Sequence, residues 1–167
     1  MRYVGIDVGS LFLKTVVLAD GKPPRIACTP HAGDPGRAVL EFAAREAGSG
    51  NGSGPEAVFR ITGAHADALA AAAGTKTLDG IRAAIAGVAA AAPGTRNIID
   101  AGGSTLTLIT LGGDGQLEGF NSNSLCAAGT GSFLDEQAAR LDVSYGDAAA
   151  FGAINDPPSI ATRCAVF

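Results

Sequence analysis

Cysteine is scarce in this sequence, which has only Cys28, Cys126 and Cys164 among 167 residues. Three cysteines so far apart cannot form the dense set of disulfides that stabilises small extracellular domains. In a reducing compartment such thiols more often bind a metal or take part in redox chemistry. The shortage therefore excludes a disulfide scaffold and leaves metal binding or catalysis to be decided from the surrounding residues.

Clustered positive charge and long apolar runs are also missing. The 12 Lys and Arg are scattered and are outnumbered by 16 Asp and Glu, so we expect no nucleic-acid partner. The longest apolar run, residues 83–92, is too short to span a bilayer, and residues 1–10 lack the features of a signal peptide. We therefore expect a cytoplasmic protein with no membrane partner.

The residues that are present predict an α/β fold in which one pattern occurs twice. Strand-like segments, a helix after Pro35 and two alanine-rich helices precede Pro93, after which a second set of strand-like segments begins. The predicted strands lie at 3–9, 13–20, 25–30 and 57–62, then at 96–103, 105–111 and 116–122. Each half starts with a β-meander whose first strand ends in aspartate followed by glycine. We expect two related lobes, residues 1–93 and 94–167.

The turns after the two aspartates have the composition of phosphate-binding loops, called here the first loop (residues 5–15) and the second loop (residues 100–105). Glycine lets the backbone approach a phosphate, and a neighbouring aspartate can hold Mg²⁺, usually through water. Lys14 can add a positive charge. Either turn alone is more simply an ordinary hairpin, but the repetition favours a nucleotide clamped between lobes. The expected residues are Asp7, Gly9, Ser10, Lys14, Asp100, Gly102, Gly103, Ser104 and Thr105.

Cys126 lies in the segment CAAGTGSFL, just before the start of a predicted helix. A helix N-terminus stabilises a thiolate or another anion, which a buried inert thiol does not need. Cys164 follows two prolines, and a twofold dimer could bring two such pairs together as four thiolates. On its own, a cysteine pair without histidine is more often structural. Cys28 is expected to be a small buried residue, and neither His31 nor His65 is expected to be a ligand.

The segments GIDVGS, IIDAGG, NSLCAAGTGSFLDEQAARL and RCAVF resemble a known family. It is the BadF/BadG/BcrA/BcrD-type ATPase family, which comprises activators of 2-hydroxyacyl-CoA dehydratases and ATP-binding subunits of benzoyl-CoA reductase. The family belongs to the actin, sugar kinase and Hsp70 superfamily. The resemblance implies an actin-like (RNase H-like) α/β fold with two lobes. Because relatives continue well past the position of Cys164, we expect an N-terminal fragment with a truncated second lobe.

The resemblance also implies the cofactors and the partner. Asp7 and Asp100 are the expected catalytic residues of a site for ATP or ADP with Mg²⁺, and Cys126 and Cys164 from two subunits of a homodimer are the expected ligands of one shared 4Fe-4S cluster. ATP hydrolysis would drive a low-potential electron onto a 2-hydroxyacyl-CoA dehydratase or a benzoyl-CoA reductase-like acceptor. The expected cofactor-binding residues are Gly9, Ser10, Lys14, Gly102, Gly103, Ser104, Gly129 and Gly131.

The chain departs from the family pattern in both loops. Residues 11–13 are Leu, Phe and Leu where relatives have small hydroxyl residues, and Ser104 and Thr105 replace a glutamine and an aspartate. The matching residues therefore support nucleotide binding more than rapid hydrolysis. Two alternatives stay open: a small-molecule kinase of the same superfamily, such as an N-acetylhexosamine kinase, and a non-catalytic remnant.

Overall fold

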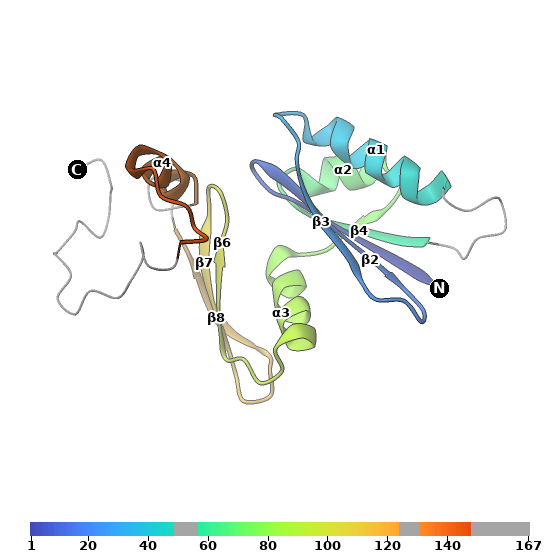
Figure 1. Cartoon of the computed structure of the whole chain (residues 1–167). Coiled ribbons are helices and arrows are strands. Elements are labelled where there is room, and N and C mark those ends of the chain that lie inside the picture. The colour runs from blue at the N-terminus through green and yellow to red at the C-terminus, as the bar shows by residue number, and fades with distance from the viewer. Residues whose placement is uncertain (49–56, 124–130, 148–167) are drawn as a thin grey trace. The chain divides into compact units, whose positions relative to one another are not determined.

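The computed structural model describes residues 1–48, 57–123 and 131–147 (Figure 1). The chain divides into two compact units, Met1–Pro93 and Gly94–Phe167. In the described residues, none of the helices is long and apolar enough to cross a membrane.

The first unit contains a five-stranded sheet in the order β3-β2-β1-β4-β5. Strands β1, β2 and β3 form an antiparallel meander, which confirms the predicted start of the chain, while β4 pairs parallel to β1 and β5 parallel to β4. The strands are β1 (Arg2–Val8), β2 (Phe12–Ala19), β3 (Arg25–Pro30), β4 (Ala57–Gly63) and β5 (Lys76–Thr77), and the helices are α1 (Pro35–Gly48), α2 (Ala66–Ala72) and α3 (Gly80–Ala91).

The core of the first unit lies on one face of this sheet, where helices α1 and α2 cover it (Figure 1). Alternate residues of β1, Val4, Ile6 and Val8, are buried there because successive side chains of a strand point to opposite faces. Ile61 of β4 and Val39 of α1 are fully buried against them. The residues of β1 between these positions, Asp7 among them, therefore belong to the opposite face.

Cys28 is exposed, so the expectation that it is buried is wrong. It lies on the edge strand β3, every residue of which is exposed. Its cross-strand partner is Lys14 of β2, whose neighbours Leu13 and Thr15 are the buried ones. The register therefore places Cys28 on the face opposite to the core.

Glu46, near the end of α1, is the buried carboxylate of the first unit's described residues. Its Oε1 lies 2.6 Å from Nη2 of Arg25, at the start of β3. Arg2, at the start of β1, donates a hydrogen bond to the Glu46 carbonyl and lies 3.9 Å from its Oε2. These contacts connect the end of α1 to the starts of two strands.

We expect Glu46→Ala to reduce the free energy of unfolding by about 1–2 kcal/mol, because the Arg2 guanidinium, only 18% exposed, loses its neighbouring carboxylate, while Arg25, 67% exposed, regains water. Urea denaturation measures the loss. Glu41→Ala on the same helix is the matched control, since Glu41 is exposed and its ion pair with Arg37 spans 3.9 Å. Equal losses in the two variants would show that the buried pair has no special role.

The second unit contains a three-stranded antiparallel sheet in the order β6-β7-β8, followed by one described helix. Its elements are β6 (Asn97–Ala101), β7 (Leu106–Leu111), β8 (Leu117–Ser122) and α4 (Gly131–Leu141). Asp100 faces Thr107 across β6 and β7, as Asp7 faces Lys14 across β1 and β2, with both pairs shifted by 93 positions. The second meander therefore repeats the first, including its register.

Candidate functional site

The first loop is a tight turn between β1 and β2. The N–H of Gly9 donates a hydrogen bond to the carbonyl oxygen of Phe12 at 2.9 Å, which leaves Ser10 and Leu11 at the exposed tip. A Cβ atom on Gly9 would lie 3.0 Å from that same carbonyl oxygen. Glycine is therefore needed here to close the turn without moving its backbone.

Asp7 and Lys14 carry the charges beside this turn. They face each other on β1 and β2, with Lys14 Nζ 3.2 Å from Asp7 Oδ2. The side chains are 39% and 51% exposed, and an ion pair this accessible contributes little to stability. Both groups therefore remain available to a ligand: the ammonium to an anion, and the carboxylate to a hydrated cation.

Gly63, at the end of β4, holds the backbone next to Asp7, although the sequence analysis did not select it. Its φ is +92°, and a Cβ atom there would lie 2.3 Å from the carbonyl oxygen of Val8 and 2.8 Å from Asp7 Oδ1. The N–H of the next residue, Ala64, donates to the same Val8 oxygen at 2.8 Å. In the sequence, the sign of this position was a glycine directly after a predicted strand. Only the parallel pairing of β4 with β1 shows which residues Gly63 contacts.

The second loop closes in the same way. The N–H of Gly102 donates to the carbonyl oxygen of Thr105 at 2.7 Å, and a Cβ atom on Gly102 would lie 2.9 Å from Thr105 Oγ1. Asp100 is exposed on β6, but its cross-strand partner is Thr107, where the first loop has Lys14. The two loops thus share their backbone geometry and their aspartate, but only the first loop has a lysine beside the aspartate.

Helix α4 begins against the second loop. The N–H of Gly131 donates to the carbonyl oxygen of Gly102 at 3.0 Å. A Cβ atom on Gly131 would lie 3.1 Å from that oxygen and 3.6 Å from the Cα of Gly103, so a larger residue would push the helix away. The structure therefore brings Gly131 to the second loop. Gly129, Cys126 and Cys164 lie outside the described residues.

The described residues contain no group of three or more His, Cys, Asp and Glu side chains that could hold a metal ion. A single accessible carboxylate can still serve a magnesium ion. Mg²⁺ keeps several waters and is usually bound by one or two carboxylates together with phosphate oxygens, so it needs no cage of protein ligands. Asp7 and Asp100 each supply one accessible carboxylate beside a glycine turn.

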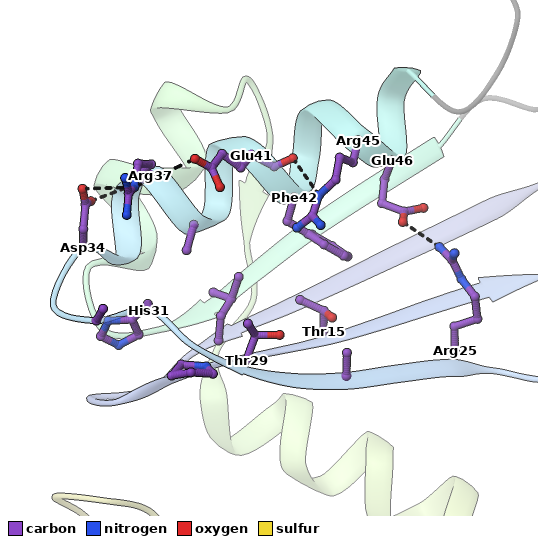
Figure 2. Close-up of a pocket in the computed structure, with 15 residues that line it drawn as sticks. Thr15, Arg25, Thr29, His31, Asp34, Arg37, Glu41, Phe42, Arg45 and Glu46 are labelled. Carbon is purple, nitrogen blue, oxygen red and sulfur yellow. Dashed lines mark hydrogen bonds and ion pairs between the residues drawn. The ribbon is translucent and has the colours of Figure 1, made fainter.

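A cavity of about 450 Å³ lies on the other side of the first sheet, between α1 and strands β2 and β3 (Figure 2). Figure 2 shows Arg25 and Glu46 at one end and His31 and Asp34 at the other. Its charged side chains pair among themselves, as in Arg25 with Glu46 and Arg37 with Asp34 at 3.7 Å. Neither Asp7 nor Lys14 lines it, so this cavity is separate from the candidate site.

Comparison with known proteins assigns the family. The sequence matches the BadF/BadG/BcrA/BcrD ATPase family over residues 4–167. The chain belongs to this family. Both the predicted family and the predicted actin-like α/β ATPase fold are confirmed.

Several relatives carry activator names. The chain is 30% identical to the (R)-2-hydroxyglutaryl-CoA dehydratase activating ATPase of Acidaminococcus fermentans, a match that covers 98% of this chain and 63% of the relative. The crystal structure of component A of that dehydratase superposes with a TM-score of 0.74 at 28% identity, covering 99% and 64% of the two chains. The Clostridium difficile activator of 2-hydroxyisocaproyl-CoA dehydratase, solved with bound ADPNP, gives 0.68 at 28% identity, covering 99% and 62%. The chain thus spans less than two thirds of these relatives.

Proposed function

We propose that this chain is the nucleotide- and cluster-binding part of an ATP-dependent iron–sulfur activator. It would deliver low-potential electrons to a 2-hydroxyacyl-CoA dehydratase or a benzoyl-CoA reductase-like partner. The observation that carries the proposal is the duplicated hairpin, in which Gly9 and Gly102 close equivalent turns beside Asp7 and Asp100. The activator names of the relatives and the ADPNP in one of them support it.

In the first loop, Lys14 and the backbone at Ser10 would bind phosphate oxygens, and Asp7 would hold Mg²⁺ through water. In the second loop, Asp100 would take the corresponding metal role, with Gly102, Gly103 and Ser104 against the phosphates. Without a ligand, Lys14 and Asp7 pair with each other at 3.2 Å. On binding, a phosphate would take the place of Asp7 beside Lys14, and Mg²⁺ would take the place of Lys14 beside Asp7, so each side chain would keep a partner of opposite charge. We expect slow hydrolysis, because Ser104 and Thr105 are too short to position a water as glutamine can.

Cys126 and Cys164 would supply thiolates from each of two subunits to one 4Fe-4S cluster. When bound, such a cluster accepts and donates single electrons at low potential. The contact of Gly131 with Gly102 supports a coupling between nucleotide and cluster. A phosphate that moves the second loop would move the start of α4, and the chain leads from there directly to the segment that contains Cys126.

Calorimetric titration with Mg-ADPNP tests the nucleotide part of this proposal. We expect the wild type to bind and Asp7→Ala to lose affinity by at least about tenfold, which corresponds to roughly 1.4 kcal/mol. Asp20→Ala is the matched control, because Asp20 is also an exposed aspartate paired with an amine, the N-terminus, at 2.6 Å. A folded wild type that does not bind, or equal affinities for both variants, would contradict the assignment of the first loop.

A further inference from the structure

His31 is a buried titratable side chain that neither the sequence analysis nor the proposed function uses. It follows β3 directly and is only 7% exposed. It lies at one end of the cavity between α1 and strands β2 and β3 (Figure 2). A buried imidazole needs a partner for each ring nitrogen, because an unsatisfied polar group away from water is costly. The partners of His31 therefore reveal what it does.

Both ring nitrogens of His31 contact backbone groups whose roles are fixed. The Gly33 N–H can only donate, and it lies 3.3 Å from Nδ1. The Gly9 carbonyl oxygen can only accept, and it lies 3.1 Å from Nε2. Nδ1 must then be the acceptor and Nε2–H the donor, so a single neutral tautomer satisfies both contacts.

The backbone of His31 contacts the same loop a second time. Its N–H donates to the carbonyl oxygen of Leu11 at 3.2 Å. The turn that holds the ring is itself compact: Ala32 and Gly33 have φ of +50° and +83°, and the N–H of Asp34 donates to the His31 carbonyl at 2.9 Å. One residue thus holds the carbonyls on both sides of the exposed tip of the first loop.

We propose that His31 is a positioning residue for phosphate binding by the first loop. In a planar trans peptide, the carbonyl of Gly9 and the N–H of Ser10 point in opposite directions. By binding the Gly9 oxygen, the imidazole directs the Ser10 N–H away from the ring and fixes it before any ligand arrives. This inference rests on the proposed function, in which the Ser10 backbone binds a phosphate.

Three variants separate this role from simple filling of space. His31→Gln keeps an N–H donor near the position of Nε2, whereas His31→Leu removes both ring contacts. Val39→Ala is the control for stability, because Val39 is fully buried in the core of the same unit and its apolar side chain makes no hydrogen bond to the carbonyl of Gly9 or Leu11. If stability alone matters, Val39→Ala and His31→Leu should behave alike.

The first measurement needs no nucleotide. In the full chain, nitrogen NMR of the imidazole should show the Nε2–H tautomer. Hydrogen exchange of the Gly9 amide should accelerate about tenfold in His31→Leu but not in Val39→Ala. The turn that this amide closes would lose its hydrogen bond from His31 to the Gly9 carbonyl, and losing one hydrogen bond costs about that factor. The opposite tautomer, or an unchanged exchange rate in His31→Leu, would overturn the positioning role even if the wild type binds ADPNP.

The second measurement is the affinity for Mg-ADPNP. We expect His31→Leu to bind about tenfold more weakly, and His31→Gln and Val39→Ala to remain within about threefold of the wild type. Equal losses in His31→Gln and His31→Leu would contradict the hydrogen-bond argument. A wild type that binds no ADPNP would instead contradict the proposed function and the role of His31 in phosphate binding. The exchange result would still decide whether His31 orders the loop.

Discussion

Replacing Gly63 by alanine is expected to reduce the free energy of unfolding of the first unit by about 3 kcal/mol or more. Two costs combine. Residues with a side chain rarely adopt a φ of +92°, and the added Cβ would lie 2.3 Å from the Val8 carbonyl oxygen, a distance that real Cβ atoms do not show. Strand β4 would have to separate from β1 at the residue next to Asp7.

Gly21→Ala isolates the cost of the clash. Gly21 has a similar φ of +71°, but nothing lies within 4 Å of the added Cβ atom. We expect this control to lose only about 1–2 kcal/mol, the cost of the left-handed conformation alone. Urea denaturation of both variants measures the difference. Equal losses would mean that β4 does not approach β1 as closely as the structure shows.

Replacing Cys126 by serine is expected to abolish binding of the proposed iron–sulfur cluster. Serine is a poor substitute for thiolate toward iron, so iron should fall from about four per dimer to background. Affinity for Mg-ADPNP should persist, because the two loops remain unchanged. Iron quantitation after anaerobic reconstitution measures the first effect and calorimetry the second, with Cys164→Ser expected to behave in the same way.

Cys28→Ser is the matched control for this experiment. Cys28 is an exposed cysteine on the edge strand β3, and it is not expected to be a ligand. Iron should therefore be retained in Cys28→Ser. A kinase of the same superfamily would tolerate Cys126→Ser and Cys164→Ser together, and a remnant would bind neither iron nor nucleotide. A folded wild type that takes up no iron would favour one of these two alternatives.

Patterns confined to one stretch of chain were readable from the sequence. The alternation of apolar residues predicted the β-meander, and the Asp-x-Gly turn at its first hairpin recurs at the same place in the second unit. Both signals are local: side chains alternate along a strand, and glycine marks a turn whose backbone is crowded. The elements other than the two-residue strand β5, and the two turns, therefore followed from short segments.

Features that depend on contacts between distant segments were not readable. The apolar neighbours of Cys28 suggested burial, but its face is set by pairing with β2, which places it beside Lys14. Gly63 matters because β4 lies parallel to β1, where its partner is Val8, 55 positions earlier. His31 contacts a carbonyl 22 residues before it. None of these partners can be identified without the tertiary structure, since no local pattern specifies them.

Nucleotide binding by the two loops is proposed to act on a cluster held by Cys126 and Cys164. EPR spectroscopy of the anaerobically reconstituted, dithionite-reduced protein, recorded with and without Mg-ADPNP, tests it most directly. We predict a reduced-cluster signal in the wild type that changes when Mg-ADPNP is added. At a nucleotide concentration near the wild-type Kd, the signal of Asp7→Ala should be present but change much less, because its affinity is lower. A wild-type signal that is insensitive to saturating Mg-ADPNP, or a folded protein without any cluster signal, would contradict the claim.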